Sequence, residues 1–194
     1  MGSQRSVFRS IKVADINWNR DKSVARAIQR QEPGALHCWA LERSGLAPSR
    51  LELEITESVL LGETDANFNS LEKLKAAGIR ISMDDFGTGY SSLKYLRLFP
   101  FDKLKVDRSF VQDAVDSGDS RAILQTVATL GRSLRITTLA EGVETKRQLM
   151  IVKKAGFDAA QGYLFSPPVR AGEVPRLLEK LRSAAEVKSS QKVV

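Results

Sequence analysis

Two adjacent carboxylates, Asp84 and Asp85, end an apolar run and lead directly into a glycine-containing turn, within the stretch IRISMDDFGTGYSSL from Ile79 to Leu93. Two negative charges this close repel each other unless a cation shares them, and a metal ion is the first cation to consider. Apolar and polar residues alternate over Ile79–Met83, which predicts a β-strand. The two carboxylates are therefore expected at the C-terminal end of a strand, as a candidate metal site.

Other interpretations of this segment are weaker. The triplet DFG at Asp85–Gly87 also occurs in protein kinases, but the chain has no HRD run, no VAIK strand and no GxGxxG loop. Ser91 and Lys94 form a bare SxxK without the companion motifs of serine acyl transfer. Taken alone, the segment is also compatible with an ordinary solvated acidic turn.

Length and composition limit the class of protein. With 194 residues, of which 42% are hydrophobic and 27% charged, the chain suits one substantial core and is short for two domains. No apolar run approaches the roughly 20 residues needed to span a bilayer, and the N-terminus MGSQRSVFRS lacks the apolar region of a secretory signal. We therefore expect no membrane segment and a cytoplasmic location.

Soft metal ligands and nucleic-acid signatures are scarce. The single cysteine, Cys38, excludes an internal disulfide, and with the single histidine His37 it makes a poor metal site. A metal must then be held by oxygen, which favours magnesium, manganese or calcium. The formal charge of +7 fits a polyanionic partner or a solvated surface. Because the basic residues are not interleaved with aromatic ones, we expect no DNA or RNA polymer as partner.

Strand and helix patterns alternate along the chain. This order predicts a parallel sheet with crossover helices, either closed as a barrel or left open. Thr145 and Gln148 have the spacing of a capping box at the start of one helix. The expected strands are Leu51–Ile55, Ile79–Met83, Lys103–Val106, Ile136–Ala140 and Phe157–Gln161; the expected helices are Ala66–Ala77, Ser91–Leu98, Ser120–Ser133, one ending near Gly156, and Ala171–Ala185, followed by a frayed tail from Val187.

Polar side chains recur at the ends of these predicted strands. Ionisable groups delivered by successive parallel strands are typical of a TIM-type barrel, whose active site gathers at its C-terminal face. Any one of them alone is equally well a surface or capping carboxylate. The strand-end residues are Glu54, Asp84, Asp85, Lys105, Glu141 and Gln161.

Five motifs in order carry a specific resemblance. They are LELEITES at Leu51–Ser58, DDFGTGYSSL at Asp84–Leu93, KLKVDRSFV at Lys103–Val111, LAEGVET at Leu139–Thr145 and QGYLFSPP at Gln161–Pro168. Over roughly Gly45 to Lys180 the chain resembles EAL domains, the phosphodiesterases that linearise cyclic di-GMP. The resemblance implies an α/β fold of the TIM-type (β/α)8 barrel kind, a magnesium or manganese cofactor, and hydrolysis of cyclic di-GMP to linear pGpG.

The resemblance assigns roles to residues of the site. Glu54, Asp84 and Asp85 resemble the metal ligands of the family, with Glu141 as a further ligand or as a base near the attacking water. Lys105 resembles the lysine that orients this water and offsets phosphate charge. Two metal ions about 3.5 to 4 Å apart can activate a water and stabilise both oxygens of an in-line displacement, which agrees with carboxylates arriving from several strands.

Further residues receive supporting roles from the same resemblance. Glu57 resembles the glutamate that holds the loop after Asp85. That loop, Phe86–Ser92, is associated in the family with metal binding and with contacts of a homodimer. Gln161 and Glu144 match positions that line the site, and are expected to contact the substrate.

The N-terminal part departs from the family pattern. No Glu-Ala-Leu triplet occurs in the sequence, so the ligand after which the family is named is missing. Asn17 is the nearest candidate for the asparagine ligand, although it lies further from Glu54 in sequence than the family pattern has it, and Asn19 is an alternative. The segment Asp15–Trp39 does not resemble the family; a local frameshift, an engineered junction and a diverged helix all fit this.

The expected organisation and function follow from these matches and departures. We expect a divergent segment over residues 1–41, an EAL domain from its third strand onward over 42–186, and a flexible tail over 187–194. The barrel is then incomplete, with the first strand and helix missing. Two functions remain: a metal-dependent phosphodiesterase, and a degenerate, inactive EAL domain that binds cyclic di-GMP or a protein partner. A non-functional truncated product is a third alternative.

Overall fold

The computed structural model describes residues 46–56, 65–87 and 93–190. Some residues with predicted roles lie outside the described residues. They are Asn17, Asn19, Glu57 and all but the first two residues of the loop Phe86–Ser92. Within those residues, no helix is both long and apolar enough to cross a membrane.

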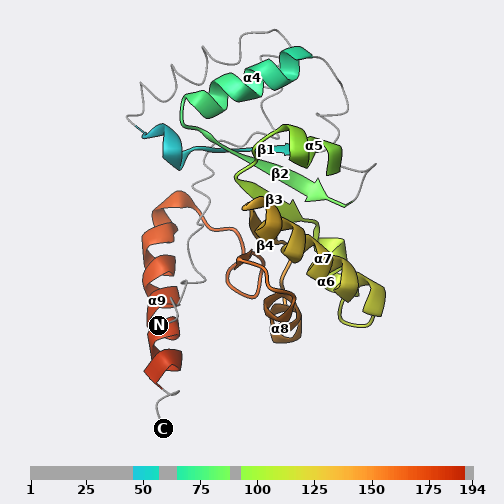
Figure 1. Cartoon of the computed structure of the whole chain (residues 1–194). Helices are drawn as coiled ribbons and strands as arrows, with labels where there is room; N and C mark the ends of the chain where they lie inside the picture. Colours follow the sequence, from blue (N-terminus) through green and yellow to red (C-terminus); the bar gives the residue numbers. More distant parts are fainter. Residues whose placement is uncertain (1–45, 57–64, 88–92, 191–194) are drawn as a thin grey trace.

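A parallel sheet forms the centre of the described chain, as the alternation of strand and helix patterns predicted (Figure 1). Its strands lie side by side in chain order, and each neighbouring pair is parallel. Parallel neighbours require crossover connections, which the intervening helices supply. The strands are β1 (Glu52–Thr56), β2 (Arg80–Phe86), β3 (Lys103–Val106), β4 (Thr137–Ala140) and β5 (Ala159–Ala160).

Helices other than α9 cover one face of this sheet, and the chain has the following helices in its described part. They are α4 (Asp65–Ala76), α5 (Leu93–Leu98), α6 (Arg108–Asp113), α7 (Gly118–Leu134), α8 (Lys146–Ala155) and α9 (Val174–Ser190), with short 3-10 turns η1 (Pro48–Arg50) and η2 (Ala171–Glu173). Figure 1 shows α9 standing apart from the sheet, whereas α7 and α8 lie close to it. The helix-covered face of the sheet and the inner faces of the helices form the core.

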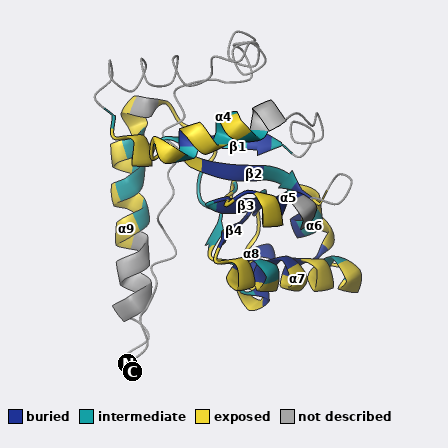
Figure 2. Cartoon of the chain, turned by 45° about the horizontal axis from the view of Figure 1, so that its top comes forward, coloured by how far each residue is buried: buried dark blue, intermediate teal, exposed yellow. Residues whose placement is uncertain are grey.

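Alternation along the strands separates the core from the polar face. Leu53 and Ile55 of β1 and Ile81 and Met83 of β2 are buried between the strands and the helices. The residues between them in sequence point to the opposite face, because successive side chains of a strand alternate. Figure 2 shows that the middle strands are largely buried, while the outer sides of α7 and α8 are exposed. Polar residues at alternate strand positions therefore share one face.

The helix termini follow their sequence signals. Thr145 and Gln148 form the predicted capping box at the start of α8, with the Thr145 hydroxyl accepting from the Gln148 amide and the Gln148 side chain accepting from the Thr145 amide. In α7, Gly131 lies against β4, where an added Cβ would collide with Thr138 Cγ2 and would lie 3.0 Å from the carbonyl oxygen of Ile136. The absence of a side chain at Gly131 thus allows α7 to approach the sheet closely.

Several element boundaries differ from the sequence predictions. Strand β2 continues through the aspartates to Phe86, whose buried ring extends the apolar pattern. Helix α6 was missed because it has six residues, too few to show a helical period. Strand β5 keeps only two of the five expected residues, since only Ala159 and Ala160 pair with β4. Helix α9 runs to Ser190, into the tail expected to fray from Val187, because its last residues include no glycine or proline.

Candidate functional site

Lys105 lies at the centre of a group of carboxylates at the C-terminal ends of the strands. Its Nζ lies 2.7 Å from Asp84 Oδ1, 2.7 Å from Glu141 Oε1 and 3.1 Å from Glu54 Oε1. The lysine side chain is 3% exposed, and the three carboxylate side chains are 20–22% exposed. We call these four residues the Lys105 cluster. The structure thus brings together four of the predicted site residues, from four neighbouring segments of the sheet.

The cluster perturbs the protonation of its members. Burial alone would lower the pKa of Lys105, but hydrogen bonds to Asp84 and Glu141 outweigh it and raise the pKa well above the ordinary lysine value. The pKa of Glu141 is raised, chiefly because burial disfavours its charged form, although Lys105 opposes the shift. The lysine therefore stays protonated beside the three carboxyl groups.

Asp85 joins the cluster through an irregularity in the strand. In a regular strand, neighbouring side chains point to opposite faces, so Asp84 and Asp85 would diverge. The pairing of β2 with β3 shifts register between Met83 and Phe86, and Asp85 has a φ of 54°. A bulge of this kind redirects a side chain. As a result, oxygen atoms of Asp84, Asp85 and Glu141 all lie within 4.8 Å of one another.

These three carboxylates suit a hard divalent cation. The site offers oxygen donors alone, the ligand type that magnesium, manganese and calcium prefer. The pKa of Asp85 is raised first by burial and then by the negative charges of Asp84 and Asp107. A cation placed between them would relieve this repulsion. The residues present therefore fit the metal expected from the sequence.

Asp107 belongs to the surroundings of the site and was not selected from the sequence. It follows β3 directly and caps α6, since its Oδ1 accepts a hydrogen bond of 2.9 Å from the Ser109 amide. Its charge contributes to the raised pKa of Asp85. The signal was present in KLKVDRSFV, where a carboxylate follows a strand, as Asp84 and Asp85 end another.

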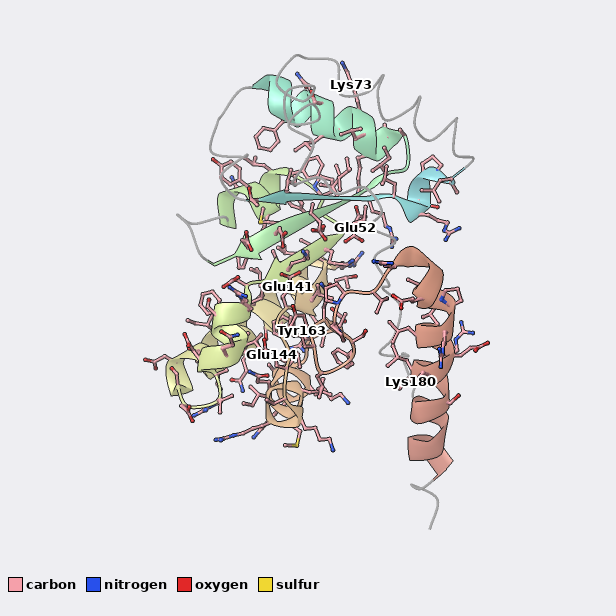
Figure 3. The ribbon with its side chains drawn as sticks, turned by 180° about the vertical axis from the view of Figure 1, so that it is seen from behind. Glu52, Lys73, Glu141, Glu144, Tyr163 and Lys180 are labelled. Atoms are coloured by element: carbon pink, nitrogen blue, oxygen red, sulfur yellow. The ribbon has the colours of Figure 1, made fainter. Side chains whose placement is uncertain are left out.

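The two residues expected to contact substrate occupy the same end of the sheet. The Gln161 amide donates to the carbonyl of Ala140, and its carbonyl accepts from the Val143 amide, both at 2.9 Å, so the backbone beside Glu141 is fixed. Glu144 is exposed at the start of α8 (Figure 3). In the described part of the chain, Glu144 forms no ion pair with Lys105. Contact of Gln161 and Glu144 with substrate stays a prediction.

Comparison with known proteins identifies the family. The model of the EAL domain matches residues 23–168. The chain belongs to the EAL domain family. The match begins before residue 42, the boundary that we placed from the motifs alone. The parallel sheet of the described residues is therefore part of a TIM-type barrel of the EAL type, and it is incomplete within those residues.

Characterised relatives and solved structures agree with this assignment. The EAL domain is 44% identical over 143 residues to the cyclic di-GMP phosphodiesterase NbdA of Pseudomonas aeruginosa, covering 74% of this chain and 18% of NbdA. It resembles the structure of the PaMucR phosphodiesterase in complex with c-di-GMP, with a TM-score of 0.72, 40% identity, and coverage of 77% and 61% of the two chains. For a manganese/cy-diGMP complex of Klebsiella pneumoniae BlrP1, the TM-score is 0.66 and the identity 36%, with coverage of 70% and 35%. The chain spans between 16% and 21% of the lengths of curated relatives such as NbdA.

Proposed function

We propose that this EAL domain carries the metal-binding and phosphate-binding residues of a cyclic di-GMP phosphodiesterase, which opens one phosphodiester to give linear pGpG. One observation carries the proposal: the ammonium of Lys105 lies within 3.1 Å of carboxylates from three segments, Glu54, Asp84 and Glu141. The similarity to NbdA and to the PaMucR complex supports cyclic di-GMP as the substrate.

The residues of the Lys105 cluster and the adjacent Asp85 have different proposed roles. Asp84, Asp85 and Glu141 would hold magnesium or manganese, and the nearby Glu54 would complete their oxygen donors. When bound, the cation supplies Lewis-acid polarisation of the phosphodiester and favours ionisation of a water. Lys105 contributes a fixed positive charge that orients the carboxylates and offsets the charge of the phosphate. Glu141 serves as a further ligand or as the base near the attacking water.

A second candidate function is a non-catalytic module that binds cyclic di-GMP or a protein partner. It is favoured by the missing Glu-Ala-Leu triplet, which removes one ligand of the family. It is also favoured by Lys105, which neutralises part of the carboxylate charge without any metal. A module that binds cyclic di-GMP would differ from the first candidate only in the absence of turnover.

The test is incubation of the purified chain with cyclic di-GMP and manganese or magnesium, with the products separated by chromatography. We expect pGpG from the wild-type chain and none from Asp84→Asn. The matched control Asp113→Asn changes one exposed carboxylate of α6 and should leave the rate unchanged. Binding of cyclic di-GMP without pGpG would favour the second candidate. Absence of both binding and turnover would exclude the phosphodiesterase and the cyclic di-GMP-binding module, and would leave only a module that binds a protein partner.

Three accompanying features are part of the proposal. We propose a cytoplasmic location, and a homodimer through the loop Phe86–Ser92. We also propose a divergent segment over residues 1–41 and an EAL domain over 42–186, although the family model already aligns from residue 23. Light scattering of the purified chain tests the dimer, because a monomer at all concentrations would contradict it.

A further inference from the structure

The outer face of α8 carries an unusual charge pattern. Lys146, Arg147, Lys153 and Lys154 are exposed on it around Met150, which is 64% exposed, and the helix contains no carboxylate. We call these five residues the basic face. Two of the cations occupy the first turn, where the positive end of the helix dipole disfavours them. The capping box stabilises the start of the helix, and the dipole favours Lys153 and Lys154 in the last turn, so helix formation leaves only Lys146 and Arg147 unexplained.

A second feature concentrates positive charge beside this face. Arg121 Nη1 of α7 donates to the carbonyl oxygens of Ala114 and Val115 at 2.7 and 3.2 Å, and Arg147 Nη2 of α8 donates to that of Val115 at 3.2 Å. Two guanidinium groups therefore converge on one carbonyl. Neither forms an ion pair with a carboxylate of the described residues, although Asp116 is next in the chain. Their like charges repel each other unless an anion approaches.

A groove between α7 and α8 adjoins both features. It has a volume of about 310 Å³ and is lined by the apolar residues Ala122, Ile151 and Ala155, together with Arg121 of α7 and Lys154 of α8. No carboxylate lines it. The two helices lie side by side with their outer surfaces exposed (Figure 2). The groove therefore combines an apolar surface with positive charge on both sides.

We propose that this groove, with the basic face, docks an acidic polypeptide segment of a partner protein, one that places an apolar side chain between its carboxylates. Charge complementarity identifies the occupant, because Arg121, Arg147 and Lys154 have no acidic partner in the described part of the chain. The concave shape favours a chain that enters the groove over a flat lipid surface. This docking surface lies outside the Lys105 cluster and does not depend on the proposed hydrolysis.

The test uses a short fluorescent peptide with leucines at helical spacing and glutamates between them, together with a version in which every glutamate is glutamine. We expect the glutamate peptide to bind the full chain in fluorescence anisotropy, more weakly as salt rises. Lys154→Glu, at an exposed residue on the bank of the groove, should weaken binding roughly tenfold. The matched control Lys180→Glu makes the same charge change on the exposed surface of α9 and should retain most of the affinity.

Four outcomes would overturn the proposal. They are failure of the wild-type chain to bind the glutamate peptide, equal binding of the glutamine peptide, and equal weakening by Lys154→Glu and Lys180→Glu. The fourth concerns vesicles of phosphatidylglycerol and phosphatidylcholine. If the wild-type chain binds them, and Lys154→Glu loses this binding but retains peptide binding, the basic face is assigned to a membrane. Circular dichroism of each variant confirms that the compared chains are folded.

Discussion

Lys105 Nζ and Glu141 Oε1 lie 2.7 Å apart, and this ion pair joins β3 to the segment that follows β4. The backbone reinforces the pair, since the Glu141 amide donates to the carbonyl oxygen of Val106 at 3.1 Å. Two neighbouring strand ends are thus connected through both main chain and side chains. Because Asp84 and Glu54 reach the same ammonium, Lys105 sets the spacing of the carboxylates before any metal binds.

Removing this ammonium should destabilise the fold. In Lys105→Met, three partly buried carboxylates lose their shared cation, and we expect a loss of about 3–5 kcal/mol in the free energy of unfolding without metal. Urea unfolding followed by circular dichroism measures this loss. The control Lys75→Met removes the ion pair with Asp102, whose side chains are 29% and 31% exposed, and should cost about 1 kcal/mol or less. Equal losses in the two variants would contradict a central role for Lys105.

Asp85→Asn should separate metal binding from folding. The substitution removes a negative charge next to Asp84, and asparagine tolerates the positive φ of 54° at this position, so the fold should be retained. Replacing one of the three carboxylates by a neutral amide oxygen should weaken manganese binding by about tenfold or more. Isothermal titration calorimetry with manganese measures the affinity. Asp116→Asn, at an exposed residue before α7, is the control, and unchanged affinity in Asp85→Asn would remove Asp85 from the ligand set.

Gly131→Ala tests the close approach of α7 to β4. The new methyl group would collide with Thr138 Cγ2 and crowd the carbonyl of Ile136, so we expect a destabilisation of about 1–3 kcal/mol. Gly118→Ala in the first turn of α7 is the matched control, because the nearest atom to its new Cβ is the end of Arg121 at 3.9 Å. That variant should be neutral or slightly more stable. A shift of the thermal midpoint in Gly131→Ala no larger than in Gly118→Ala would show that the helix moves away freely.

Asp107 predicts a dependence of stability on pH. Partial burial alone would raise the pKa of Asp107, but hydrogen bonds from the hydroxyl and amide of Ser109 outweigh it and lower the pKa below the ordinary value. A carboxylate with a lowered folded-state pKa stabilises the fold above its unfolded pKa of about 3.9, and this contribution is lost as the pH falls through the folded pKa. Asp107→Asn keeps a capping oxygen and removes the titration.

The measurement is urea unfolding of wild type and Asp107→Asn between about pH 2 and pH 6, a range that brackets the unfolded pKa of an aspartate. The stability advantage of the wild type should be full near pH 6 and should shrink toward pH 2. Asp113→Asn, at an exposed residue of the same helix, serves as the control. A constant difference between wild type and Asp107→Asn over the whole range would disprove the linkage.

Helices of several turns and helices with clear capping signals could be predicted from the sequence. The 17 residues of α7 and the capping box of α8 carry local signals that do not depend on distant contacts. Strand β5 was not accessible in the same way, since its two residues are a strand only through pairing with Leu139 and Ala140. The groove between α7 and α8 had no sequence signal either, because its banks come from helices that meet only after the chain folds.

The sequence by itself predicted which residues gather at the candidate site. Glu54, Asp84, Lys105 and Glu141 end or follow apolar strand patterns, and parallel strands necessarily deliver their ends to one edge. Only the tertiary structure decided how the adjacent Asp84 and Asp85 act together. Strand geometry alone would send their side chains to opposite faces, and the register shift against β3 with the positive φ of Asp85 brings both carboxylates toward Glu141. This shift depends on pairing between segments distant in sequence, so local residue patterns do not reveal it.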